Sequence, residues 1–284
     1  MKTLNFQKKL DVAVAKNNSL VCVGLDSDWE KLPETVRTVE YPQFVFNKAI
    51  VDSTHDLVCA YKPNSAFYEY LGSEGIRQLK LTCDYIRETY PEIPIILDAK
   101  RADIGSTNKG YVSYAFDYLK VDAITLHPYL GREAIQPFLD YKDKGCIILC
   151  RTSNPGAGEF QDLMSNLSTS SGTRNPLPLY KYVALKVVNE WNKNGNCMLV
   201  VGATYPKELD EVRKLAGDMT FLVPGIGAQG GDVKKTVKAG LNSKKSGLII
   251  NSSRGIIFAS KEADFAEVAR DETGKLTKAI NALG

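Results

Sequence analysis

Histidine is scarce in this sequence, and its cysteines are not paired by spacing. Only two histidines occur, His55 and His127, and none of the six cysteines belongs to a Cys-x-x-Cys pair. Zinc sites are built mainly from these two residue types, so the sequence gives little support for one. Residues 1–8 hold no apolar signal core, and no run of about 18 uncharged apolar residues occurs. We therefore expect a reduced, soluble, cytoplasmic protein without a metal.

The sequence also lacks an excess of either charge. Its 36 basic and 33 acidic side chains give a formal net charge of +3, and no Lys/Arg run is long enough to make a basic patch. This balance argues against a nucleic-acid or membrane partner. A hydrophobic content of 44% and a charged content of 24% are ordinary for a globular protein. Since barrels of this length commonly form one domain, we expect residues 1–284 to be a single domain.

Eight short apolar runs recur along the chain, each ending in polar residues, glycine or proline. They are nearly continuous rather than alternating, which is typical of parallel strands covered on both faces. Helical patterns separate them; Ile76, Leu79, Cys83, Ile86 and Tyr90, for example, recur at intervals of three and four. The runs are residues 20–25, 57–61, 93–97, 123–126, 146–150, 197–201, 220–223 and 247–250.

Strand followed by helix, eight times over, predicts an α/β fold, the (β/α)8 TIM barrel. A doubly wound open sheet is the alternative, but no G-x-G-x-x-G motif follows the first strand. We expect an N-terminal helix at about residues 4–17 to cover the bottom of the barrel, and a final helix at about 261–282.

One connection is unusually long. Residues 159–178, after the fifth predicted strand, are rich in Ser, Asn, Thr, Gly and Pro. Long loops without secondary structure in compact domains are often functional. Because this one follows a strand, it would lie at the face where barrel enzymes carry their chemistry. We therefore expect a lid-like loop there.

Charged and polar residues follow the predicted strands at their carboxyl ends, where barrel active sites lie. Asp98 and Lys100 would share one face of an extended strand, and Asp103 follows shortly after. An ion pair at a strand end would explain the first two alone. Packing does not explain a carboxylate or lysine at three successive strand ends, because each charge has a desolvation cost. The other residues at strand ends are Asp26, Lys62, Ser153, Pro224, Ser253 and Arg254.

Two segments late in the chain suggest a phosphate site. Residues 224–231 are rich in glycine and follow the seventh strand, and Ser253 and Arg254 follow the eighth. Barrels often bind phosphate at these two positions through backbone N–H groups and a helix N-terminus. The guanidinium fork of Arg254 can hold a phosphate at two points. The glycines alone are also compatible with a simple tight turn.

Residues 98–107, with the sequence D-A-K-R-A-D-I-G-S-T, resemble the D-x-K-x-x-D-I-x-x-T signature of the orotidine 5′-phosphate decarboxylase family. The resemblance continues in order through G-L-D at 24–26, K-P at 62–63, T-S-N-P-G at 152–156, P-G-I-G-A-Q at 224–229 and Arg254. The long spacings resemble the longer bacterial branch of that family. The resemblance implies decarboxylation of orotidine 5′-phosphate to UMP in de novo pyrimidine biosynthesis, without cofactor or metal.

The resemblance also implies a role for each residue. Lys62, Asp98, Lys100 and Asp103 would form an alternating charge network, in which Lys100 protonates the C6 carbanion and Asp98 lies near the departing carboxylate. Asp26 and Lys62 would hold ribose hydroxyls, and Ser153 would read the pyrimidine edge. In a homodimer, Asp103 and Thr107 would come from the other subunit. The remaining implied substrate contacts, chiefly to phosphate, are Pro224, Gly227, Gln229, Ser253 and Arg254, with Gln229 on a closing loop; Ser252 is an alternative to Ser253.

Three other functions fit parts of this pattern. Magnesium-dependent sugar-phosphate decarboxylases and hexulose-phosphate aldolases of the same superfamily share D-x-K-x-x-D, but they carry an acidic metal ligand where this chain has Lys62. A Schiff-base aldolase needs a lysine in an apolar pocket, whereas Asp98 and Asp103 flank Lys100 and favour its ammonium form. A phosphate-binding sensor or scaffold would not need all four charged residues. Their joint presence favours the decarboxylase.

Overall fold

The computed structural model describes residues 4–165, 176–226 and 232–283. Its central sheet has eight parallel strands in the spatial order β2-β1-β10-β9-β8-β5-β4-β3. Bridges from Tyr61 to Ile95 and from Asn64 to Asp98 join β2 to β3 and close the barrel, so the predicted fold is confirmed. The strands are β1 (Val21–Leu25), β2 (Ala60–Pro63), β3 (Ile96–Arg101), β4 (Ala123–Leu126), β5 (Gly145–Arg151), β8 (Cys197–Val201), β9 (Phe221–Val223) and β10 (Leu248–Ser252).

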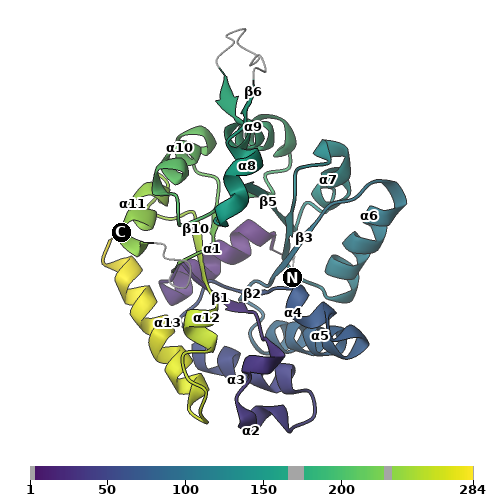
Figure 1. Cartoon of the computed structure of the whole chain (residues 1–284), viewed down its shortest axis with the longest axis vertical. Coiled ribbons are helices and arrows are strands. Elements are labelled where there is room, and N and C mark those ends of the chain that lie inside the picture. The colour runs from purple at the N-terminus through teal and green to yellow at the C-terminus, as the bar shows by residue number, and fades with distance from the viewer. Residues whose placement is uncertain (1–3, 166–175, 227–231, 284) are drawn as a thin grey trace.

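Helices pack around the outside of this barrel (Figure 1). Those of six residues or more are α1 (Phe6–Asn17), α3 (Pro42–Thr54), α5 (Gly72–Thr89), α6 (Gly105–Val112), α7 (Gly131–Leu139), α9 (Leu179–Lys186), α10 (Pro206–Ala216), α11 (Val233–Gly240) and α13 (Phe265–Asn281). Single helical turns form α2 (Glu34–Arg37), α4 (Ala66–Glu69), α8 (Gly158–Gln161) and α12 (Arg254–Ile257), and π-helical stretches Ser113–Tyr118 and Val187–Trp191 extend α6 and α9. In the described ranges, every helix is too short or too polar to cross a bilayer.

The apolar runs located the strands but not all of their ends. β4 and β8 match the predicted ranges 123–126 and 197–201. β2 and β3 instead begin at Ala60 and Ile96, although their apolar runs begin at residues 57 and 93. The residues that lead into these strands are buried at the bottom of the barrel, for example Val58 at 0% exposure and Ile93 at 1%. The apolar runs therefore also include buried residues that lie outside the regular strands, of which Ile95 forms an isolated bridge to Tyr61.

Helix α1 closes the bottom of the barrel. Its Phe6 and Leu10, each 2% exposed, pack against the apolar side chains that point into the barrel. Gly145 makes room for this contact, because a Cβ atom there would lie 2.6 Å from the ring of Phe6. In Figure 1, α1 crosses the middle of the ring of outer helices. The inward side chains in this cluster are Cys22, Cys59, Ala60, Ile96, Ala123, Ile147, Met198, Val200, Leu222 and Ile249.

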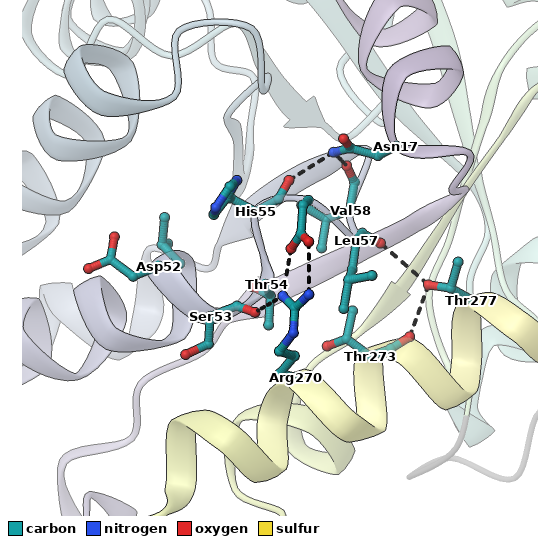
Figure 2. Close-up of polar contacts among 12 residues, drawn as sticks. Asn17, Asp52, Ser53, Thr54, His55, Leu57, Val58, Arg270, Thr273 and Thr277 are labelled. Atoms are coloured by element: carbon teal, nitrogen blue, oxygen red, sulfur yellow. Dashed lines mark hydrogen bonds and ion pairs between the residues drawn. The ribbon is translucent and has the colours of Figure 1, made fainter.

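The two ends of the chain meet at the loop that leads into β2 (Figure 2). From α13, Arg270 donates two hydrogen bonds to the carboxylate of Asp56, at 2.6 and 2.8 Å. From the end of α1, Nδ2 of Asn17 donates to the backbone oxygens of His55 and Val58, each at 2.8 Å. Both terminal helices therefore hold the start of the strand that carries Lys62.

The connection after β5 has more secondary structure than its composition indicates. It forms a 3-10 turn at Pro155–Ala157, helix α8 and an antiparallel pair of strands, β6 (Met164–Ser165) and β7 (Leu177–Pro178). The pair is joined by backbone contacts and by a hydrogen bond from Oγ of Ser165 to the oxygen of Leu177 at 2.9 Å. Residues 166–175 of the expected loop lie outside the described part of the chain.

Substitution of Phe6 tests the role of α1. We expect Phe6→Ala to lower the free energy of unfolding by about 3–5 kcal/mol, because it opens a cavity beneath the barrel. Val12→Ala is the matched control, since Val12 lies on the outer face of the same helix at 47% exposure. Urea unfolding of both variants measures the difference. Equal, small effects would show that α1 does not stabilise the barrel through Phe6.

Candidate active site

A cavity of about 490 Å³ opens at the carboxyl ends of the strands. It gathers charged residues from the carboxyl ends of β1, β2 and β3. Predicted site residues in its wall are Asp26, Lys62, Asp98, Lys100, Ser153, Pro224, Ser253 and Arg254. Residues not predicted also line it, among them Asn64, Thr125, Asn154, Gln161 and Asn251. Eight strand-end residues proposed from the sequence thus share one cavity.

Lys62 is the most deeply buried charge of this site. Its side chain is only 3% exposed, and its Nζ lies 3.0 Å from Oδ2 of Asp98 and 3.7 Å from Oδ1 of Asp26. In the described part of the chain, this Oδ1 of Asp26 accepts no hydrogen bond. This oxygen has almost no exposed surface, and it lies beside the buried ammonium of Lys62.

Asp98 connects the two lysines. Its Oδ1 accepts a hydrogen bond from Nζ of Lys100 at 2.6 Å and one from Oγ1 of Thr125 at 2.9 Å, while its Oδ2 faces Lys62. Lys100 is far more accessible than Lys62, with 49% of its side chain exposed. The ammonium group of Lys62 is thus nearly buried, whereas that of Lys100 is half exposed to the cavity.

Lys100 owes its position to an irregular backbone. The pairing of β3 with β4 shifts register between Leu97 and Arg101, and Lys100 adopts a left-handed conformation with φ of 49°. A residue without a glycine's freedom pays roughly 1–3 kcal/mol for such a backbone, which persists only where the surroundings fix it. Oγ1 of Thr125 accepts the backbone N–H groups of Ala99 and Lys100, both at 3.0 Å, and so fixes it here.

Neighbouring charges hold Lys62 and Asp98 in their ionised forms. Burial alone would lower the pKa of Lys62, but the carboxylates of Asp26 and Asp98 outweigh it and hold that pKa above its ordinary value. Burial would likewise raise the pKa of Asp98, but the ammonium groups of Lys62 and Lys100 hold it well below the usual range. At neutral pH the cavity therefore contains a carboxylate between two lysines.

Asp103 and Thr107, two of the predicted site residues, lie outside this cavity. Asp103 is half-buried, and its Oδ1 accepts the backbone N–H of Ile104 at 2.7 Å. Thr107 is exposed on α6. The chain by itself thus does not bring these two residues to Lys100. Gly227 and Gln229 lie outside the described residues.

The expected phosphate side of the cavity is made by β10 and the residues after it. Ser253 precedes α12, and Arg254, its first residue, is exposed at the rim. Gly24 on β1 makes room for Ser253, since a Cβ atom at Gly24 would lie 1.9 Å from Oγ of Ser253. The glycine of the G-L-D motif therefore leaves the space that the side chain of Ser253 occupies.

Uncharged residues of the wall escaped sequence reasoning for two different reasons. Asn64, Thr125 and Asn251 lie on or just after strands, at positions that point inward, and Gln161 lies on α8. Treating the strands as uniformly apolar hid the inward position of Thr125, two residues after Ala123. Counting alternate positions from the inward apolar residues would have found it. Nothing in the sequence indicates that Gln161 folds back onto the cavity.

This arrangement has the chemistry of a site that stabilises negative charge on a ligand. Lys100 offers a half-exposed ammonium group, and Arg254 offers a second cation in the cavity wall. Within the described ranges, no three His, Cys, Asp or Glu side chains converge as metal ligands would. The cation next to Asp26 and Asp98 is the ammonium of Lys62.

Comparison with known proteins gives one consistent result. A model of the orotidine 5′-phosphate decarboxylase / HUMPS family matches residues 19–269. The orotidine 5′-phosphate decarboxylase of Cellvibrio japonicus is 49% identical over 280 residues, 98% of each chain, and that of Ralstonia nicotianae is 47% identical over 267 residues, 94% of each. The structure of Leishmania donovani OMP decarboxylase superposes with a TM-score of 0.83 at 38% identity, covering 99% of both chains. The chain therefore belongs to the orotidine 5′-phosphate decarboxylase / HUMPS family.

Proposed function

We propose that this protein decarboxylates orotidine 5′-phosphate to UMP in de novo pyrimidine biosynthesis, using neither metal nor cofactor. The observation that carries the proposal is the chain of charges Lys62–Asp98–Lys100 in the cavity, with Asp98 2.6 Å from Lys100 and 3.0 Å from Lys62. Relatives 45–49% identical over nearly the whole chain carry the name of this enzyme. The family also includes HUMPS enzymes, and Lys62 is the residue that argues against a metal-dependent member.

In the proposed reaction, the bond between C6 and the carboxyl carbon breaks, its electron pair stays on C6, and CO2 leaves. The ammonium of Lys100 then gives its proton to C6 to form UMP, and the resulting amine regains a proton from water. Lys100 assists most in the transition state, when charge has moved from the carboxylate to the carbon next to it. Asp98 holds Lys100 in place and lies near the departing carboxylate.

The remaining residues of the cavity would orient the substrate. Asp26 and Lys62 bind ribose hydroxyls in this proposal, and Ser153 reads the pyrimidine edge. Ser253 and Arg254 hold the phosphate, with Pro224, Gly227 and Gln229 from the segment after β9. Because the phosphate is far from C6, its binding energy can offset the cost of ordering the site before reaction.

The proposal also includes a homodimer. Asp103 and Thr107 belong to the resembling motif but lie outside the cavity of their own chain. Asp103 is half-buried and Thr107 is exposed in the single chain, so we propose that each subunit gives these two residues to the ribose in its partner's cavity.

Turnover in the presence of a chelator tests the function itself. We expect the purified protein to remove the orotate absorbance of orotidine 5′-phosphate at the same rate with and without excess EDTA. Activity that vanishes with EDTA and returns with magnesium would favour a sugar-phosphate enzyme of the superfamily. Absence of turnover under both conditions would favour a barrel that binds without reacting.

Lys100→Ala tests the proton donor. We expect kcat to fall by at least about 100-fold, because the general acid and its positive charge are both lost, while UMP still binds. Lys9→Ala is the matched control, since Lys9 forms an ion pair of 2.8 Å with Asp122 at the other end of the barrel. The proposed role of Lys100 is wrong if Lys100→Ala retains the turnover of the Lys9→Ala control.

Mixed dimers test the shared site. Lys100→Ala and Asp103→Ala chains, with different affinity tags, are each expected to be nearly inactive as homodimers. In a mixed dimer, the site of the Asp103→Ala chain has its own Lys100 and receives Asp103 from its partner. We therefore expect activity to return to about half the wild-type value per dimer. No recovery in the purified mixed dimer would place Asp103 in the cavity of its own chain.

A further inference from the structure

Gln161, the last residue of α8, connects that helix to the turn after β5. Its Oε1 accepts the backbone N–H of Thr152 at 2.9 Å and Nη1 of Arg151 at 3.3 Å. Its Nε2 donates to Oγ1 of Thr152 at 2.8 Å. The hydroxyl of Thr152 is in turn 2.6 Å from Oδ1 of Asn154. Gln161, Thr152 and Asn154 all line the proposed active-site cavity, as does Ser153 between them.

Only one direction of hydrogen bonding satisfies these contacts. A backbone N–H and a guanidinium can only donate, so the oxygen of the Gln161 amide must face them. The NH2 group of Gln161 therefore faces Thr152, whose hydroxyl accepts this bond and donates its own hydrogen to Asn154. The chain thus fixes Asn154 by its amide oxygen and leaves its NH2 group as a donor at the cavity wall.

Arg151 holds one end of this series of hydrogen bonds. Its side chain is only 3% exposed, and its guanidinium lies 4.4 Å from the ring centroid of Tyr205 and 3.2 Å from Oδ2 of Asp162. A buried cation that moves away from these partners loses their compensation for its desolvation. Arg151 therefore stays in place, and it holds the acceptor end of Gln161 with it.

We propose that Gln161 is a positioning residue for recognition of the base. Through Thr152, it preorganises the turn of residues 152–154 before the ligand binds. Ser153 and Asn154 then face the polar edge of the pyrimidine without an entropic cost of ordering on binding. This inference rests on the proposed function, in which Ser153 reads that edge. The groups proposed for ribose and phosphate come from other strands, so the effect of Gln161 concerns the base alone.

Two ligands separate this role from a general structural one. UMP carries the base, whereas ribose 5-phosphate offers the same phosphate and a sugar without it. For Gln161→Met, which keeps the length of the side chain but makes no hydrogen bond, we expect the affinity for UMP to fall by roughly 10- to 100-fold. The affinity for ribose 5-phosphate should stay within a factor of about two. Inhibition constants against orotidine 5′-phosphate turnover, or calorimetry, measure both.

Gln78→Met is the matched control. Gln78 is buried, at 1% exposure, whereas Gln161 is half-buried; like that of Gln161, its Oε1 accepts a backbone N–H, that of Gln43 at 2.8 Å, but Gln78 is not part of the cavity wall. We expect Gln78→Met to lower stability and to leave the ratio of the two affinities unchanged. If both ligands weaken equally in Gln161→Met, Gln161 does not act on base recognition. If UMP fails to bind the unmodified protein, the proposed function itself is wrong.

If Gln161→Met folds poorly, a second variant tests the same series of hydrogen bonds from Gln161 through Thr152 to Asn154. Gln161→Glu keeps an oxygen for Thr152 and Arg151 but replaces the donor that faces the hydroxyl of Thr152. That hydroxyl must then donate to the carboxylate, and Asn154 is released. We expect near wild-type thermal stability together with the loss of UMP affinity seen for Gln161→Met. Full UMP affinity in a stable Gln161→Glu variant would show that the direction of the hydrogen bonds from Gln161 through Thr152 to Asn154 does not matter for base recognition.

Discussion

A lysine that is 3% exposed dictates the arrangement of the first three strands. Burying the ammonium of Lys62 has a desolvation cost that only nearby negative charge can offset. Asp98 supplies such a charge at 3.0 Å and Asp26 at 3.7 Å. These residues come from β1, β2 and β3, and the last two strands are joined only by isolated bridges. The charges thus draw together the part of the barrel where backbone pairing is sparsest. Removing either carboxylate would leave the buried ammonium of Lys62 with a single partner, so a change at this site also affects the stability of the fold.

The same period of two residues builds the core and the cavity. On β2, β3 and β4, the inward apolar residues Ala60, Ile96 and Ala123 are followed two positions later by the cavity residues Lys62, Asp98 and Thr125. Side chains on a strand alternate between its faces, so the lower layer fills the barrel and the next layer faces the ligand. The apolar layer, closed beneath by α1, keeps water away from the lower side of the charged layer. It therefore strengthens the interactions among these charges.

The sequence was sufficient for the barrel and for the charged half of the site, because both leave strong local signals. Continuous apolar runs located the eight strands, and a carboxylate or lysine after a buried strand has few structural explanations. The uncharged half left weaker signals. Thr125 is an ordinary strand residue until its inward direction is known, and Gln161 reaches the cavity only because α8 folds back over β5. The starts of β2 and β3 were misplaced because the apolar residues before them are buried but lie outside the regular strand ladder, where Ile95 forms only an isolated bridge to Tyr61. Asp103 and Thr107 remain outside the cavity of a single chain, where sequence proximity to Lys100 cannot decide which site they serve.

Thr125 shows why the uncharged residues matter as much as the charged ones. Its hydroxyl donates to Asp98 and accepts the backbone N–H groups of Ala99 and Lys100. One atom thus orients the carboxylate and stabilises the left-handed backbone that aims Lys100 at it. A regular strand would place residues 98 and 100 on one face, separated along the strand by about 6–7 Å. The irregular backbone instead allows contact at 2.6 Å and keeps the ammonium of Lys100 half exposed. The charge pair therefore depends on backbone geometry, and that geometry depends on a hydroxyl from the neighbouring strand.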